Sequence, residues 1–260
     1  MIIHRINYRV RITLAFAVCT FIGVSSFGGA FGRTILTALG GGFVVVDPYG
    51  GVSASGLRAS CDVSPFRGRY VISDAAGAPN GSDLYMVLSS PESSLIVACG
   101  SSYRVSQLIP YYLTAIAVGP DRLMASEGRT GRFILLDLRS LSPIGKGMIS
   151  DVDEVSSLAY DFGSGNVFAY DQLSGKVLII GWSGQPYSEI HLSGIDDATA
   201  FAVDSLRGRV VLGVSGNLVF VDRQSRLIGS VPTGGRRISS IAVSPSGGIG
   251  AIVDGAFRTF

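Results

Sequence analysis

A segment of about 40 residues recurs four times in the second half of the chain. Each copy opens with a short apolar run that carries a small residue at one fixed position. These residues are 42, 43 and 40 positions apart and are Ala117, Ala159, Ala202 and Ala242. A period near 40 is typical of propeller blades and of solenoids, in which each repeat packs against its neighbours.

Each repeat divides into four short runs of strand character, separated by glycine-bearing turns such as Gly128–Gly131 and Ser174–Gly175. No run has the 3.6-residue periodicity of an amphipathic helix, which excludes solenoids of paired helices. Four-stranded sheets arranged around an axis fit the pattern, and small residues suit the crowded innermost strands. The opening strands are expected within 113–121, 155–161, 198–204 and 238–245, the second at 122–126, 166–170 and 210–214, the third at 133–137, 177–180 and 218–222, and the fourth at 145–149, 188–192 and 227–231.

The two ends of the chain are expected to share a blade. The last repeat has only its first strands and a short final run, while 40–57 resembles the missing later strands. Pairing these segments would remove the open sheet edges that promote aggregation. Residues 58–110 supply one further, irregular blade with an insertion at 75–82. The predicted fold is therefore an all-β propeller of about five four-stranded blades over residues 31–260, with the last blade closed by the N-terminal strands.

The repeat that starts at Leu158 carries a family resemblance. Its sequence from Leu158 to Asp171, continued by Ser174–Ile180, resembles the blade pattern of the YVTN, NHL and SMP-30/gluconolactonase-like propellers. The resemblance covers residues 111–260 and implies the fold. These families include lactonases, peptidylglycine lyases, surface proteins and scaffolds, so one function does not follow. No residue here matches the metal-binding Glu, Asn and Asp of the SMP-30-type lactonases one by one, and no catalytic residue is transferred.

Residues 1–30 have the features of an export signal. Arg5, Arg9 and Arg11 give a basic front, Ile12–Val24 is uncharged and mainly apolar, and Gly28–Ala30 offers small residues for cleavage. The alternative is an uncleaved anchor, because residues 10–32 are long and apolar enough to cross a bilayer. The expected location is secreted or periplasmic, or membrane-anchored and extracytoplasmic if the segment stays.

Composition and charge narrow the classes of partner. Hydrophobic residues make up 47% of the chain and charged residues 15%, against a typical charged share of about 25%. This excludes a disordered chain and a nucleic-acid-binding tail. Without the three arginines of residues 1–30, the chain has 18 Lys and Arg residues and 19 Asp and Glu residues, which gives a formal net charge of −1. No nucleic acid partner is expected.

Two cysteines, Cys61 and Cys99, lie outside the N-terminal segment. An oxidising compartment favours a disulfide between them, and the alternative is a pair of buried thiols that pack as small hydrophobes. In the chain-entropy model a bridge closing this loop contributes about 3–4 kcal/mol. Its role would be structural.

Charged residues gather in the loops predicted for one face of the propeller. Those loops join the fourth strand of a blade to the first of the next, and the second strand to the third. Carboxylates converging at the channel mouth are typical of a calcium or ligand site; the alternative is ordinary turn residues. The candidates are Glu127, Asp153, Glu154, Asp171, Asp196, Asp197, Arg236 and Arg237, with Asp151, Arg129 and Asp254 beside them.

Signals for catalysis are sparse. Apart from His4, the chain has one histidine, His191, in a predicted outer strand, and no G-x-S-x-G or P-loop motif. Trp182 lies in the loop after a predicted third strand. Its ring could pack against the edge of the blade or form a platform on which a ligand stacks. The sequence favours an exported, non-catalytic propeller that binds a protein partner or small ligand through its loop face. The alternatives are a metal-dependent lactonase or hydrolase, and a subunit of a membrane-associated assembly held by residues 10–32.

Overall fold

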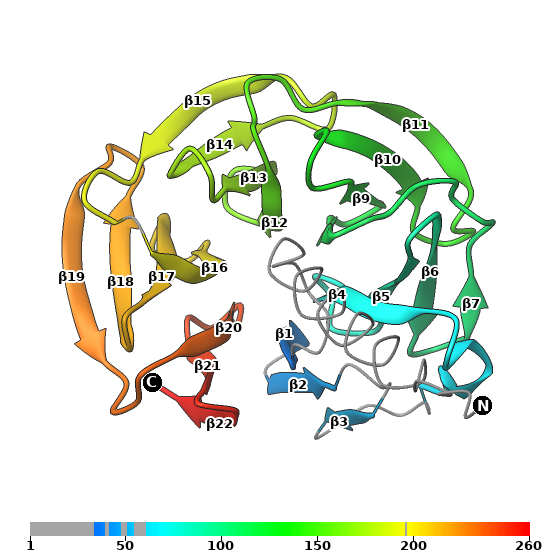
Figure 1. Ribbon diagram of the computed structural model, residues 1–260, viewed down its shortest axis with the longest axis horizontal. Helices are drawn as coiled ribbons and strands as arrows, with labels where there is room; N and C mark the ends of the chain where they lie inside the picture. The colour runs from blue at the N-terminus through cyan, green and yellow to red at the C-terminus, as the bar shows by residue number, and fades with distance from the viewer. Residues whose placement is uncertain (1–33, 40–41, 48–50, 55–60, 196) are drawn as a thin grey trace, which may run out of the picture.

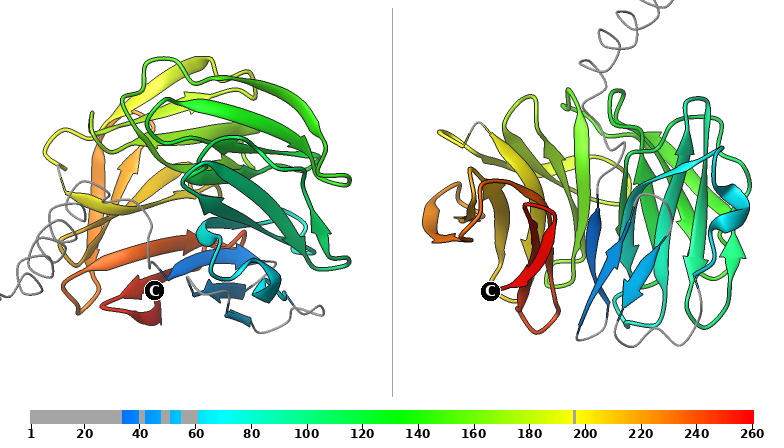
Figure 2. Two further views of the ribbon diagram at one scale, coloured as in Figure 1. Left: turned by 45° about the vertical axis from the view of Figure 1, so that its right-hand side comes forward. Right: turned by 60° about the horizontal axis from the view of Figure 1, so that its bottom comes forward.

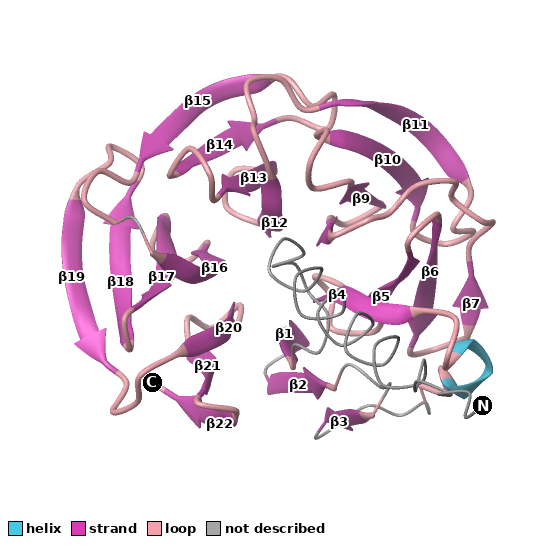
Figure 3. Cartoon of the chain, viewed as in Figure 1, coloured by secondary structure: helices cyan, strands magenta, loops and turns pink. Residues whose placement is uncertain are grey.

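The computed structural model describes residues 34–39, 42–47, 51–54, 61–195 and 197–260. Over these ranges the regular structure is almost entirely β-strand (Figure 3). The one helix among them is a single 3₁₀ turn, η1 (Ser64–Phe66). Short apolar runs between glycine turns produce this result, because no run is long enough or suitably periodic for an amphipathic helix.

Antiparallel sheets follow one another in chain order around a central axis (Figure 1). Among the described residues there are four sheets of four strands, flanked at the ends of the chain by two of three strands. We number them from one to six. The first contains β1 (Ile35–Leu39), β2 (Gly42–Val46) and β3 (Val52–Ala54); the second β4 (Val71–Gly77), β5 (Leu84–Ser90), β6 (Ser93–Cys99) and β7 (Arg104–Val105); the third β8 (Ala115–Val118), β9 (Arg122–Ser126), β10 (Arg132–Asp137) and β11 (Pro143–Met148); the fourth β12 (Val155–Asp161), β13 (Asn166–Asp171), β14 (Lys176–Ile180) and β15 (Pro186–His191); the fifth β16 (Ala198–Asp204), β17 (Arg209–Val214), β18 (Asn217–Asp222) and β19 (Leu227–Pro232); the sixth β20 (Ile238–Val243), β21 (Ile249–Val253) and β22 (Ala256–Thr259).

The ring is a β-propeller. The first strand of every sheet lies innermost, and each inner strand contacts the next, including β20 and β1 across the junction of the two ends. The predicted all-β propeller of about five four-stranded blades is confirmed in its architecture: four sheets have four strands, and the two sheets at the ends of the described chain have three each. The strands expected from the repeat agree with those observed to within a few residues.

The prediction that the two ends share one blade is wrong. Ile35–Leu39 was not expected to be a strand, yet it pairs with β2 in the register Leu36↔Val45 and makes β2 the second strand of its own sheet. The first and sixth sheets therefore pack side by side instead of merging (Figure 2). Leu36 N donates to Ser240 Oγ across this seam at 2.9 Å, and the Phe43 and Phe257 ring centroids lie 5.7 Å apart.

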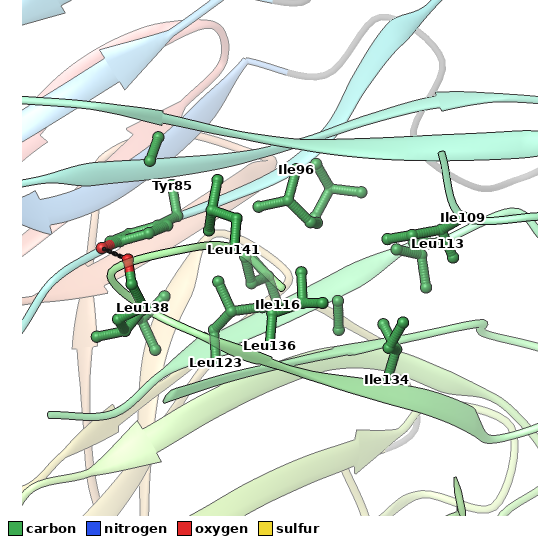
Figure 4. Packing of buried hydrophobic residues seen from close by; sticks show 14 of the residues in the cluster. Tyr85, Ile96, Ile109, Leu113, Ile116, Leu123, Ile134, Leu136, Leu138 and Leu141 are labelled. Atoms are coloured by element: carbon green, nitrogen blue, oxygen red, sulfur yellow. Dashed lines mark hydrogen bonds between the residues drawn. The ribbon is translucent and has the colours of Figure 1, made fainter. Parts of the chain in front are cut away.

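Apolar side chains fill the spaces between neighbouring sheets. Figure 4 shows this core between the second and third sheets, where Tyr85, Leu123 and Leu136 are almost fully buried. The Tyr85 hydroxyl donates to the carbonyl of Leu138 at 3.3 Å, which satisfies its polar end. Each fully buried Leu or Ile contributes about 1.5–3 kcal/mol, so these contacts between sheets hold the ring together.

The predicted disulfide is confirmed. Cys61 and Cys99 are bonded, with 5.4 Å between their Cα atoms, and tie the segment before β4 to the end of β6. The bond belongs to the irregular second blade, whose last strand, β7, has only two residues. No helix among the described residues has the length and apolar character needed to span a membrane. The predicted signal or anchor, residues 1–30 or 10–32, lies outside them.

Candidate functional site

The loops expected to share one face lie together. Asp171, at the end of β13, accepts hydrogen bonds from the main-chain amides of Asp153 at 2.8 Å and Glu154 at 3.3 Å. The amide of Val155 donates to the carbonyl of Gly128 in the preceding sheet at 2.7 Å. Turns between second and third strands therefore contact the loops that enter the next blade. We call this side of the ring the loop face.

Two of the carboxylates on this face organise loops. Asp171 is fully buried, and Asp254, at the equivalent place in the sixth sheet, accepts from the amides of Arg236 at 3.0 Å and Arg237 at 2.9 Å. These main-chain hydrogen bonds lower the pKa of Asp254 because they favour its charged form. Both carboxylates thus fix the backbone of the loop leading into an inner strand.

The remaining candidates are spread over the face. Asp153, Asp197, Arg236 and Arg237 are exposed, and Asp196 lies outside the described residues. Glu127 accepts from the Thr130 hydroxyl at 2.5 Å, with Arg132 Nε 3.8 Å away. Within the described part of the chain, no three His, Cys, Asp or Glu side chains gather closely enough to hold a metal ion. Calcium binding stays a prediction.

A channel runs along the ring axis. It contains two cavities of about 130 and 160 Å³. The first includes Glu154 and Gln172 and opens toward the loop face. The second extends to Tyr160 and Phe162 at the other end of the inner strands. Residues common to both linings are Ile35, Asp74, Ser157, Phe201, Ser240 and Ile241.

The inner strands share a local distortion near the first cavity. Strand pairing skips one residue early in each of four inner strands, and the skipped residues are Ser73, Ser156, Thr199 and Ser239. A β-bulge of this kind frees a residue from the ladder and re-aims its side chain. A hydroxyl residue therefore stands at matching points around the channel mouth.

Two of these hydroxyls, those of Ser73 and Thr199, connect neighbouring blades, as does the hydroxyl of Thr114. Ser73 Oγ donates to the carbonyl of Leu113 at 2.9 Å and Thr114 Oγ1 to that of Val155 at 3.4 Å. Thr199 Oγ1 donates to the carbonyl of Ile238. Between the fourth and fifth sheets, the Tyr170 hydroxyl reaches the carbonyl of Ala198 at 3.3 Å. Each acceptor carbonyl belongs to the residue just before the bulge in the next blade, or to the equivalent residue where no bulge occurs. Because these serine and threonine hydroxyls bond the backbone of the next blade, their role is structural.

Asp74 is the site residue that the sequence analysis missed. It follows the bulge of β4 at the position occupied by Ser157, Ala200 and Ser240 in other blades. Its Oδ2 accepts from the amide of Ile116 at 2.8 Å and its Oδ1 from its neighbour's amide, that of Ala75, at 2.9 Å. Burial raises the pKa of Asp74 to about 7, against the lowering effect of both hydrogen bonds. The sequence feature that could have identified Asp74 is the pair Ser73-Asp74, which occupies the same position as Ser239-Ser240. The equivalence is difficult to recognise because the second blade has irregular strand lengths.

His191 and Trp182 make ordinary contacts with neighbouring side chains. His191 lies on the outer strand β15, as expected, and its Nε2 is 2.9 Å from Glu189 Oε1. Trp182 packs against Tyr160, with centroids 5.7 Å apart, and a Cβ added to Gly119 would lie 2.6 Å from its ring. The glycine therefore makes room for the indole, which favours packing over ligand stacking.

Comparison with known proteins supports the fold only. No protein-family model and no curated protein matches the chain. Among solved structures, a chain of the "Crystal Structure of Mitotic Checkpoint Complex" superposes with a TM-score of 0.56 and 14% sequence identity, over 90% of this chain and 92% of that one. At this identity the likeness shows a shared β-propeller architecture.

Proposed function

We propose that the protein is an exported, non-catalytic β-propeller that binds a protein partner through its loop face. The observation that carries this proposal is the fixed backbone of that face. Asp171 and Asp254 each hold two consecutive main-chain amides of an entering loop. Side chains on loops held in this way are ordered before a partner arrives, which reduces the entropy lost on binding.

The exposed charges of the loop face suit recognition of a protein. Acidic side chains precede β12 and β16, whereas Arg236 and Arg237 precede β20. Charges of both signs at fixed places favour a partner with the complementary pattern and affect chiefly specificity and association rate. The resemblance to YVTN and NHL propellers, families that include surface proteins and scaffolds, points in the same direction.

Export is the second part of the proposal. The disulfide Cys61–Cys99 is typical of proteins that fold in an oxidising compartment, and residues 1–30 carry the expected signal features. N-terminal sequencing of the protein recovered from outside the cytoplasm tests this part. A start near Phe31 supports cleavage and a secreted or periplasmic location, whereas an intact N-terminus supports the anchor.

Partner binding is tested with matched surface variants. The full chain with an affinity tag is expressed at native level in its source, and the co-purifying proteins are compared between wild type and two loop-face variants, Asp153→Lys and Arg236→Glu/Arg237→Glu. Lys146→Glu, an exposed change on the outer strand β11, is the control. We expect one partner to co-purify with the wild type and with the control but not with the loop-face variants. Equal recovery from all of them contradicts the proposal.

A further inference from the structure

We propose that the central channel binds a small organic cation of the primary-ammonium class, with the carboxylate of Asp74 as its counter-ion. The inference rests on the charge, width and hydrogen-bonding capacity of the channel. It does not depend on the loop face binding a protein.

The charge of the lining favours a cation. Asp74 borders both cavities and Glu154 borders the first. No Lys, Arg or His is among the described residues that line either cavity. Asp74 is half-buried, so the field of its carboxylate is less screened than that of a carboxylate on the open surface.

The width of the channel favours a slender ligand. Each of the six inner strands contributes at least one alanine to the second cavity, and β4 also contributes Ala75. One alanine from each strand recurs around this cavity. These residues are Ala38, Ala76, Ala117, Ala159, Ala202 and Ala242. A wall of methyl groups accepts an unbranched alkyl chain without polar partners. The repeat spacing seen in the sequence thus has a second consequence, since the same alanines that let the inner strands converge leave the channel open.

The far mouth offers aromatic faces to an approaching cation. The rings of Tyr160 and Phe162 are 5.2 Å apart and nearly perpendicular, and 45% of Phe162 is exposed. Aromatic faces attract ammonium groups through the ring quadrupole. A cation entering here passes aromatic rings and then the alanine wall before it reaches Asp74.

Asp74 retains capacity for a ligand. An ionised carboxylate has about four acceptor positions, and the amides of Ala75 and Ile116 occupy two. Ser157 and Ser240 line the same shared region. Each hydroxyl oxygen has two acceptor positions, of which the Leu36 amide occupies one on Ser240, so both can offer a further acceptor to the N–H groups of an ammonium. Each cavity is close in volume to an engineered cavity of about 150 Å³ that admits benzene, so a ligand of five or six non-hydrogen atoms fits.

The ionisation of the lining predicts how binding varies with pH. The titratable groups that line the two cavities are Asp74, Glu154, Tyr160 and Tyr170. Burial raises the pKa of both tyrosines, that of Tyr170 to about 12, so both stay neutral near pH 8. Ionisation of Asp74 near pH 7 should therefore strengthen binding of an ammonium group between pH 5 and pH 8.

The test is an NMR or calorimetric titration of the full chain with n-butylammonium chloride at pH 8. A dissociation constant of about 1 mM or tighter is expected, which five non-hydrogen atoms can supply. Neutral n-butanol and anionic butyrate are the ligand controls. Asp74→Asn should weaken binding at least about tenfold, and Ala159→Leu should block it by narrowing the channel. Glu189→Gln, at an exposed carboxylate on the outer strand β15 with 44% of its side chain accessible, should bind as wild type does.

Thermal melts show that each variant is folded, and a titration with an acetylated, amidated Gly-Lys-Gly peptide separates two sources of the ammonium group. If both butylammonium and the peptide bind, the channel can take the lysine side chain of a partner. If butylammonium alone binds, the ligand is a free small amine. The proposal is overturned if butylammonium does not bind, if butanol binds equally well, or if folded Asp74→Asn binds as tightly as wild type. A response to calcium chloride without one to butylammonium also overturns it.

Discussion

The carboxylate of Asp74 in the second sheet accepts a hydrogen bond from the amide of Ile116 in the third sheet, at 2.8 Å. Ser240 makes the equivalent contact at the seam between the chain ends, where its hydroxyl accepts from the amide of Leu36 at 2.9 Å. In both cases the residue after a bulge bonds the second residue of the next inner strand. The same type of contact between neighbouring inner strands is thus made by a carboxylate, that of Asp74, between the second and third sheets. At the seam between the chain ends it is made by a neutral hydroxyl, that of Ser240.

Asp74 should make the stability of the fold depend on pH. Because its folded pKa of about 7 lies above the ordinary 3.8, the unfolded chain releases this proton first, and the free energy of unfolding falls as pH rises from about 4 to about 7. The loss is at most about 4 kcal/mol. Urea denaturation across this range should show the fall in wild type.

The variant Asp74→Asn should remove most of that fall. The substitution also leaves the amide of either Ala75 or Ile116 without its acceptor, which costs about 1–3 kcal/mol at any pH. The decisive quantity is therefore the change of the unfolding free energy with pH, not its absolute value. The same slope in wild type and in Asp74→Asn would show that another group is responsible.

Ser240→Ala should loosen the closure of the ring. Removing the hydroxyl leaves the Leu36 amide without its acceptor, at a cost of about 1–3 kcal/mol. Hydrogen exchange followed by mass spectrometry should show faster exchange in 34–39 with little change in β12–β15. Ser183→Ala, at an exposed turn, is the matched control. Unchanged protection of 34–39 in Ser240→Ala would mean that packing alone closes the seam.

Asp254→Ala should release the loop before β20. The amides of Arg236 and Arg237 lose their carboxylate acceptor, so they should exchange faster, whereas Asp121→Ala should leave them unaffected. In wild type the pKa of Asp254 lies below 3.8. The protection should therefore persist at neutral pH and disappear only as pH falls below about 4. Loss of protection between pH 7 and pH 5 would contradict this assignment.

Reduction of Cys61–Cys99 should destabilise the second blade. The chain-entropy model gives about 3–4 kcal/mol for a loop of this length. Dithiothreitol should therefore lower the melting temperature of wild type but leave that of Cys61→Ala/Cys99→Ala unchanged. An equal effect of the reductant on both proteins would show that it acts elsewhere.

The repeat predicted most of the fold because spacing and strand pattern are local properties. Strands β9, β12 and β16 have the expected bounds to within a residue. Closure by the two ends of the chain was predicted, but in the wrong form: residues 40–57 were expected within the last blade, whereas β1 heads a separate sheet and packs against β20. The error lies in one strand, Ile35–Leu39, which stands outside the recognised repeats.

The loop face was predicted from the same pattern, whereas the interior of the channel was not. Asp171 and Asp254 lie where expected, but their hydrogen bonds to main-chain amides depend on loop conformations that spacing does not specify. Asp74 was overlooked because the second blade has irregular strand lengths. Its role follows from burial and from the amide of Ile116, 42 positions away.

Binding of a protein partner by the loop face is tested most directly by affinity measurements on the partner recovered in co-purification. Its affinity is measured for Arg236→Glu/Arg237→Glu and for Lys146→Glu, at low and high salt. We predict that the loop-face variant binds more weakly and with a smaller dependence on salt, while Lys146→Glu binds as wild type does. Unchanged affinity of the loop-face variant together with weakened binding by Lys146→Glu would contradict the claim and would place the interface on the outer strands.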